Sequence, residues 1–224
     1  RNPQGWLPAS DGNRVIIDES SAIGWFFAQS LADSLPDVPI GVIQTALGGA
    51  PIEAFVSRRR LEDNPQLREI MYNWRENAMV QDWIRDVAKA NLEGSSNPLQ
   101  RHFFDPAYLF ESRIAPMAGY GIDGVLWYQG ESNAHNADLY AKLFPEMVRS
   151  FRDAFLNYRA PKFYYVQLSS IGDRLSWPDF RNTQRLLNLK EDGPYLSLPT
   201  FIDVYYTPLT QPKKKKVQTL LVLV

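Results

Sequence analysis

Polar side chains suited to acyl-transfer chemistry gather in the segment QGESN at 129–133, which follows a short apolar run and precedes a helical pattern. Glu131 can orient a base, accept hydrogen bonds from sugar hydroxyls, or hold the loop by accepting backbone N–H bonds, and these three roles stay open. Gln129 and Asn133 carry amide donors, and such donors can stabilise a tetrahedral oxyanion. Ordinary turn chemistry is the alternative for Asn133.

Ser132 lies in GESNA, which resembles a degenerate G-x-S-x-G nucleophile elbow. The last glycine of that motif is replaced by Ala134, and a nucleophilic serine needs a histidine base that normally comes from another loop. The chain has 2 histidines: His135 is too close along the chain, and His102 lies in an aromatic-rich loop. We therefore expect the Ser132 hydroxyl to act in the turn or as a helix N-cap rather than as a nucleophile, and we favour an incidental role for His102.

A second turn, LGGAP at 47–51, follows the apolar run at 40–46. Gly48 and Gly49 can let a backbone N–H approach a substrate oxygen closely, and a turn with positive φ is a compatible alternative. In α/β sheets, ligands bind beyond the carboxyl ends of the strands. Because both turns follow predicted strands, we expect LGGAP and QGESN to lie side by side, with Gly49 near Gln129.

The elements that must hold these turns alternate between helical and strand patterns. Helices are predicted at about 20–35, 65–87, 139–155 and 177–189, and strands at 40–46, 125–128, 162–168 and, more weakly, 198–204. The tail fits a helix from Lys213 or a strand at 217–224. This alternation favours one α/β domain with helices on both faces of a sheet.

Composition excludes several classes of function. The 224 residues carry a net charge of −1, which gives no general attraction to nucleic acid or to an anionic membrane. There are 0 cysteines, so disulfides, cysteine zinc sites and thiol nucleophiles are excluded. No apolar stretch is long enough for a membrane span. No P-loop, dinucleotide fingerprint or metal-ligand cluster is present, so no cofactor is expected.

Four blocks in order resemble the bacterial sialate O-acetylesterase family, a branch of the SGNH hydrolases. They are GVIQTALGGAPIEAF, GVLWYQGESNAHNADLY, YYVQLSS and WPDFRNTQRLL, at 41–55, 124–140, 164–170 and 177–187. The resemblance covers most of the chain from Trp6 to Leu187. It implies a flavodoxin-like three-layer α/β/α fold with a central, mostly parallel sheet. It also implies serine-dependent removal of acetyl esters from sugar hydroxyls, without a metal, in a secreted or periplasmic protein.

Matched residue by residue, the resemblance implies that Gly49 is a backbone oxyanion donor, with Gly48 beside it at the substrate. It implies that Gln129 or Asn133 completes the oxyanion hole, and that Glu131 supports the catalytic histidine or the loop. With these roles, the expected binding partner is an acetylated carbohydrate. The oligomeric state is not indicated.

The chain departs from the family at its catalytic triad. The family's nucleophile lies in a GQSN-like turn, which we expect to precede Arg1, so the single domain at 1–224 lacks that segment. Against the family's DVHPK-like region, Leu209 stands at the aspartate and Gln211, which can still contact substrate, at the histidine. Glutamine cannot accept the nucleophile's proton at neutral pH.

Three explanations of these departures stay open: a cleaved or discontinuous chain, unreliable residue identities after about Leu189, or an inactive sugar-binding relative. A lipase-like hydrolase that uses Ser132 is a further alternative.

Overall fold

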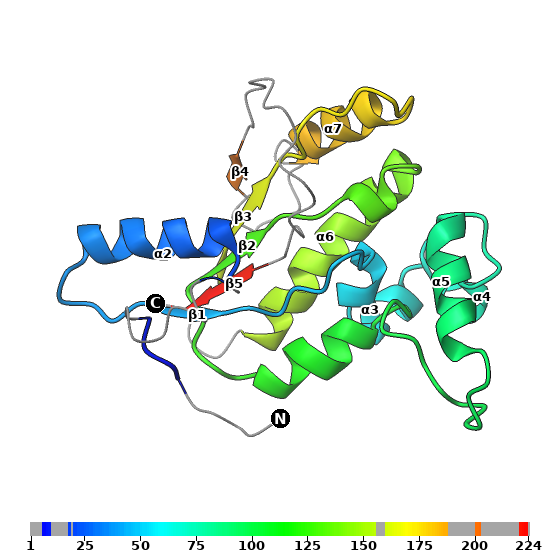
Figure 1. Cartoon of the computed structure of the whole chain (residues 1–224), viewed down its shortest axis with the longest axis horizontal. Helices are drawn as coiled ribbons and strands as arrows, with labels where there is room; N and C mark the ends of the chain where they lie inside the picture. The colour runs from blue at the N-terminus through cyan, green and yellow to red at the C-terminus, as the bar shows by residue number, and fades with distance from the viewer. Residues whose placement is uncertain are drawn as a thin grey trace.

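The computed structural model describes residues 6–9, 18, 20–155 and 160–187, together with the backbone of two strands at 200–202 and 220–223. Within these residues, helices surround a small sheet (Figure 1), and more of the chain is helical than extended. The expected mixed α/β class is therefore confirmed.

The sheet has five strands in the order β1-β5-β2-β3-β4. Their bounds are Gly41–Ile43 for β1, Gly124–Trp127 for β2, Lys162–Val166 for β3, Thr200–Ile202 for β4 and Leu220–Leu223 for β5. β3 pairs in parallel with both β2 and β4, whereas β5 is antiparallel to both β1 and β2. The parallel part of the sheet is therefore smaller than expected. Because β1 and β2 both run opposite to β5, their carboxyl ends still meet at one edge.

The α-helices are α2 (Ala22–Ser34), α3 (Arg58–Asp63), α4 (Arg68–Asn73), α5 (Asp82–Leu92), α6 (Ala137–Ala154) and α7 (Trp177–Leu186). Of these, α2, α6 and α7 agree with the predicted ranges. Short 3-10 helices span Ile52–Phe55 (η2), Ala115–Met117 (η4) and Glu131–Asn133 (η5), and a π-helix spans Phe110–Ile114 (η3). Ser21 caps α2, because its side chain accepts a hydrogen bond from the Gly24 N–H at 3.5 Å.

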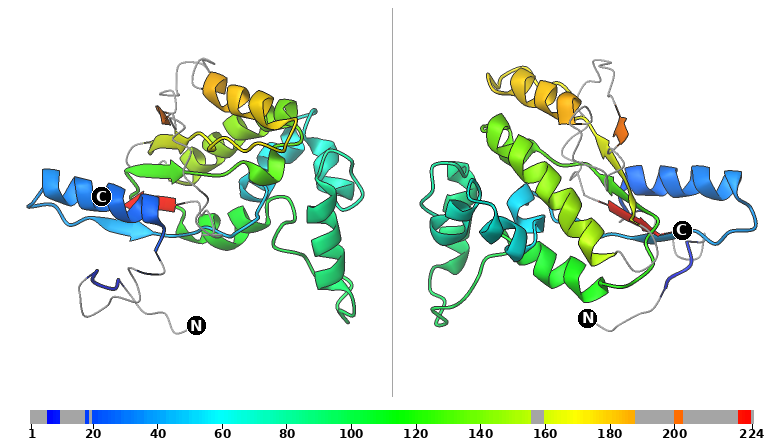
Figure 2. Two further views of the ribbon diagram at one scale, coloured as in Figure 1. Left: turned by 45° about the horizontal axis from the view of Figure 1, so that its top comes forward. Right: turned by 180° about the vertical axis from the view of Figure 1, so that it is seen from behind.

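The prediction of one long helix at 65–87 is wrong, since α4 and α5 are separate helices. Between them the side chain of Asn77 accepts a hydrogen bond from the Met79 N–H at 2.9 Å, and its carbonyl accepts one from Val80 at 3.0 Å. Asparagine favours turns because its side chain competes for backbone donors in this way. Both helices stand at the opposite end of the molecule from α2 (Figures 1 and 2).

The two faces of β2 pack against different helices, as a strand's alternating side chains require. Trp127 packs edge-to-face against Phe55 of η2 and Phe151 of α6, with ring centroids 5.3 and 6.3 Å apart. Leu126 faces the other way, in a small cluster with Phe27 of α2. Trp127 therefore packs against η2 and α6, and Leu126 packs against α2. On the second face α2 is the single covering helix in the described part of the chain, so the complete three-layer arrangement stays an expectation.

Candidate functional site

The LGGAP and QGESN turns lie side by side, as the sequence predicts. The Gln129 side-chain amide donates to the Ala50 carbonyl at 3.2 Å, and the Ser132 hydroxyl donates to the Gly49 carbonyl at 2.8 Å. Both turns leave the sheet at the carboxyl ends of β1 and β2. The placement follows from the shared strand direction rather than from direct pairing, because β5 separates the two strands.

A cavity of about 550 Å³ opens where the two turns meet. The polar part of its lining comes from the turns, with Gly48, Gly49, Gln129, Glu131 and Ser132. The apolar part comes from Leu47 of the first turn and from Val87, Phe103 and Phe104. Within the described residues, the N–H groups of Gly48 and Gly49 donate to no acceptor. The lining therefore combines two glycines whose N–H groups have no acceptor in the described structure with a group of apolar side chains.

The apolar lining residues Val87, Phe103 and Phe104 come from a part of the chain that the sequence patterns did not connect with the site. Helix α5 supplies Val87, and the loop after it supplies the two phenylalanines. The Trp83 and Phe104 rings pack edge-to-face with centroids 6.1 Å apart. The sequence signal for this part of the site was a dense run of aromatic residues between two amphipathic patterns. Aromatic residues also pack into cores, so the run did not point to a site.

Gly49 is glycine for two structural reasons. Its φ of +78° lies in the left-handed region, which side chains with a Cβ adopt only under strain. A Cβ at this position would also lie 3.2 Å from the Trp83 ring and 3.3 Å from the Phe104 ring. The backbone of the LGGAP turn therefore lies directly against the rings of Trp83 and Phe104.

Glu131 lines the cavity, and its environment shifts its protonation. Burial raises the pKa of the carboxyl above its ordinary value, while the backbone N–H groups of Glu131 and Gly130 and the charge of Arg174 oppose the rise. The three roles considered for Glu131 therefore stay open. Tyr128, which also lines the cavity, has its pKa raised first by burial and then by the nearby charge of Glu131.

Ser132 and His135 each bond to a backbone carbonyl rather than to each other. The Ser132 hydroxyl donates to the Gly49 carbonyl, and Nε2 of His135 lies 2.7 Å from the Met79 carbonyl. Of the two expected places, the Ser132 hydroxyl acts in the turn and not at the helix start, because the helix after the turn, α6, is capped by the side chain of Asn136. Ser132 instead joins the two turns, because its position inside η5 directs its side chain across to LGGAP.

His102 has a structural environment. It is 3% exposed, its Nδ1 accepts from the Phe104 N–H at 3.1 Å, and its Nε2 lies 2.9 Å from the Asn91 amide. Burial, followed by the charge of Arg75, lowers its pKa. The His102 ring orders the loop that carries Phe103 and Phe104. The interpretation of His102 as incidental missed this role.

Behind the cavity, Asn133 joins three segments. It is 3% exposed, and its Oδ1 accepts from the Ile52 N–H at 2.9 Å and from the Gln129 amide at 2.8 Å. Its Nδ2 donates to Glu53 at 2.9 Å. Gln129 lines the cavity and Asn133 does not. Glu53, which sequence reasoning did not single out, is fully buried, and burial raises the pKa of its carboxyl.

The positions expected to replace the base and its orienting carboxylate, Gln211 and Leu209, lie outside the described residues. The part of the chain that is described contains no group of three or more His, Cys, Asp or Glu side chains placed to hold a metal ion. It also contains no helix long and apolar enough to span a membrane.

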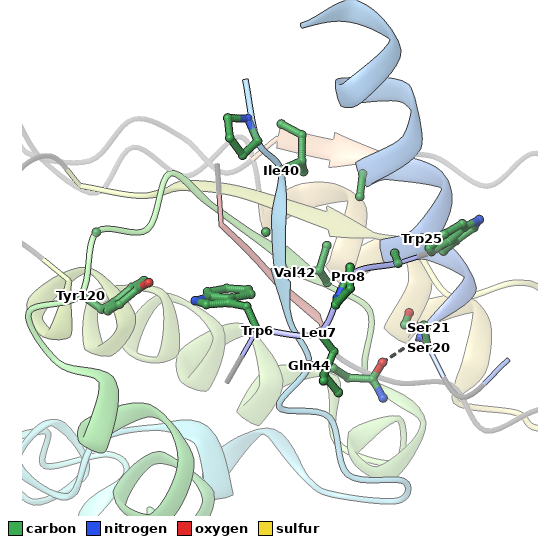
Figure 3. Close-up of a pocket in the computed structure, with 15 residues that line it drawn as sticks. Trp6, Leu7, Pro8, Ser20, Ser21, Trp25, Ile40, Val42, Gln44 and Tyr120 are labelled. Atoms are coloured by element: carbon green, nitrogen blue, oxygen red, sulfur yellow. Dashed lines mark hydrogen bonds between the residues drawn. The ribbon is translucent and has the colours of Figure 1, made fainter. Parts of the chain in front are cut away.

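A larger cavity of about 810 Å³ lies away from both turns, beside the edge strand β1. Figure 3 shows Trp6 and Tyr120 on one side of it, Trp25 on the other, and the Gln44 side chain directed at the start of α2. Gln44 accepts a hydrogen bond from the Ser21 N–H at 2.7 Å. Its described lining includes no charged or histidine side chain, so size alone does not make it a site of chemistry.

Comparison with known proteins gives one consistent relationship. Residues 100–193 match the family described as carbohydrate esterase, sialic acid-specific acetylesterase. A rat protein named sialate O-acetylesterase is 34% identical over an alignment of 166 residues, which covers 67% of this chain and 30% of the rat protein. The mouse protein of that name is 35% identical over an alignment of 170 residues, which covers 67% of this chain and 29% of the mouse protein. The human protein is 33% identical over an alignment of 138 residues, which covers 60% of this chain and 21% of the human protein. The chain therefore spans less than a third of these curated relatives.

Proposed function

Because the chain belongs to the sialic acid-specific acetylesterase family of carbohydrate esterases, we propose that the protein is an O-acetylesterase that acts on acetylated sugars. The reaction removes an acetyl ester from a sugar hydroxyl through a serine acyl-enzyme. Water then releases acetate. The names of the relatives point to sialic acid as the sugar.

The observation that supports this proposal best is the cavity between the two turns. Acyl transfer passes through a tetrahedral oxyanion, and backbone N–H groups fixed in a partly dry site stabilise that charge strongly. The N–H groups of Gly48 and Gly49 are without an acceptor in the described structure, and both glycines line the cavity together with apolar side chains. This lining suits an acetyl carbonyl at the glycines and an apolar sugar face at the apolar side chains.

Within this proposal, Gly49 is the principal oxyanion donor and Gly48 contacts the substrate beside it. Gln129 acts at the cavity wall, and Asn133 acts from behind it. Both hydrogens of the Gln129 amide are used by Ala50 and Asn133, so donation to an oxyanion requires release of the longer bond, to Ala50 at 3.2 Å. Glu131 supports the catalytic histidine or the loop.

The nucleophile and base of the proposed reaction lie outside the described site. The resemblance assigns the serine to a GQSN-like turn that these 224 residues do not contain, and the base to the region of Gln211. In this proposal Gln211 faces the substrate. Loss of a triad costs about 10⁶-fold in a serine protease, although an oxyanion hole alone retains part of the catalysis.

The test is acetate release from an O-acetylated sialic acid, combined with peptide mapping of residues 200–224. With Leu209 and Gln211 confirmed, release is expected to be negligible. Robust release with a histidine found at 211 would support the esterase and correct the tail. Robust release with glutamine confirmed there would contradict the assignment of the base.

Two alternatives rest on specific residues. An inactive sugar-binding relative is favoured by leucine and glutamine at 209 and 211, and it would bind the acetylated sugar without releasing acetate. A hydrolase that uses Ser132 is disfavoured by the hydrogen bond from that hydroxyl to Gly49. Stoichiometric labelling of Ser132 by a fluorophosphonate would reverse that judgement.

A further inference from the structure

Glu53 is a carboxyl group buried directly behind the two turns. It is the second residue of η2, the 3-10 helix that follows LGGAP, and it is 1% exposed. Its Oε2 accepts a hydrogen bond from Nδ2 of Asn133 at 2.9 Å. Its backbone carbonyl accepts one from the Ala107 N–H at 2.9 Å, so Glu53 also contacts the loop that follows Phe104. A carboxyl in this place requires a reason, because burial of such a group is costly.

Asn133 connects Glu53 to Gln129 through hydrogen bonds. Its Oδ1 receives two donors, the Ile52 N–H at 2.9 Å and the Gln129 amide at 2.8 Å, while its Nδ2 donates to Glu53. A flipped Asn133 amide would direct its NH₂ group at both donors. Its orientation is therefore fixed, and Glu53 is the acceptor that satisfies its donor side.

The Gln129 amide is the last group in this series of hydrogen bonds, and Gln129 lines the cavity. Its two N–H groups donate to Asn133 Oδ1 and to the Ala50 carbonyl, so the plane of the amide is set by these two acceptors. Displacement of Asn133 would free one of these hydrogens and let the amide rotate. A rotated amide would present a different polar group to a substrate.

We propose that Glu53 is a positioning residue, which holds Asn133 so that Asn133 can fix the Gln129 amide at the cavity wall. The geometrical part of this inference is independent of the proposed function, and its effect on substrate rests on that function. Glu53 touches no substrate in this arrangement, because it does not line the cavity.

The test exchanges the two partners of the Glu53–Asn133 bond. Asn133→Asp keeps an oxygen toward Ile52 and Gln129, but it places a carboxylate oxygen against Glu53, and facing carboxylates repel. Adding Glu53→Gln restores a donor and an acceptor with their roles reversed. The readouts are the side-chain NH₂ resonances of Gln129 in ¹⁵N spectra and the affinity for an O-acetylated sialic acid.

We expect Asn133→Asp to shift the Gln129 resonances and to weaken binding about tenfold, the effect of one lost buried hydrogen bond, and the double variant to recover to within about threefold of the wild type. If the single variant does not fold, Glu53→Leu tests the same coupling and should shift the Gln129 resonances, whereas Glu53→Gln should shift them less. Unchanged Gln129 resonances in every variant, or a double variant no better than the single one, would overturn the proposal. If the wild type binds no sugar, the proposed function fails, and the resonances still decide the positioning role.

Discussion

At the scale of single residues, the site depends on side chains and glycines that have little freedom to change. Gly49 must be small and left-handed, and Glu53 must be buried and able to accept a hydrogen bond. The amino-acid sequence identified Gly49 and Asn133 as candidates from their turn context. It could not identify Glu53, because its partner Asn133 is 80 positions away in the chain.

Replacing Gly49 with alanine tests both constraints on this residue. We expect Gly49→Ala to lower the free energy of unfolding by about 2 kcal/mol, since it adds backbone strain to a close contact with Trp83 and Phe104. Gly94→Ala is the matched control, because Gly94 has a φ of +76° and open space around it. Urea unfolding of both variants separates the two effects, and an equal loss in the two would show that the aromatic contact contributes nothing.

The raised pKa of Glu53 predicts a pH dependence of stability. A carboxyl with a higher pKa in the folded state binds its proton more tightly there than in the unfolded chain. Its contribution is full below its ordinary pKa of 4.5 and is lost as the pH rises through the raised value. Relative to Glu53→Gln, the wild type should therefore become less stable as the pH rises above 4.5. The measurement is the difference in unfolding free energy between the two proteins at several pH values, and a constant difference would contradict the raised pKa.

At the scale of elements, two helices hold the QGESN turn from behind. The Gln129 carbonyl accepts hydrogen bonds from Tyr140 of α6 at 3.3 Å and from the Gln184 amide of α7 at 3.1 Å. Between the strand and η5, Gly130 has a φ of +155° and lies against the Phe180 ring of α7. The turn is therefore packed into the core rather than free at the surface.

Gly130→Ala should disturb this packing more than Gly49→Ala disturbs the other turn. A Cβ at Gly130 would lie 2.6 Å from the Phe180 ring, which is fully buried and has little room to move. We expect a loss of about 3 kcal/mol in unfolding free energy, from overpacking and backbone strain together. Gly172→Ala, at an open position, is the control, and both are measured by urea unfolding. A loss no greater than that of the control would show that α7 does not constrain the turn.

The sequence predicts elements well where the signal is local. Helices α2, α6 and α7 and strands β2 and β3 follow their hydrophobic periodicity, and the Ser21 cap follows from residue type. Pairing across the sheet is not local, so the antiparallel position of β5 between β1 and β2 could not be read from composition. The break between α4 and α5 was missed because apolar residues continue through it, while Asn77 forms the turn.

At the scale of the whole molecule, the fold brings segments far apart in the chain to one cavity. The turns at 47–51 and 129–133 contribute to its lining, and so do α5 and the loop after it. The sequence predicted the meeting of the turns from the common direction of their strands. It did not predict the contribution of α5, since nothing local specifies where α5 packs. Family membership and this cavity are the two observations on which the proposal of an acetylated sugar as the ligand rests.

The most direct test is whether this cavity binds an acetylated sugar in preference to the same sugar without its O-acetyl group. We predict that an O-acetylated sialic acid binds roughly three- to tenfold more tightly than the unacetylated one, because burying one methyl group contributes ~0.8 kcal/mol or more. Val87→Trp should abolish that binding by filling the cavity, whereas Ala90→Trp, on the same helix but outside the cavity lining, should leave it intact. Isothermal titration calorimetry of the three proteins with both sugars supplies the measurement. Equal affinity for the two sugars, or binding that survives Val87→Trp unchanged, would contradict the account.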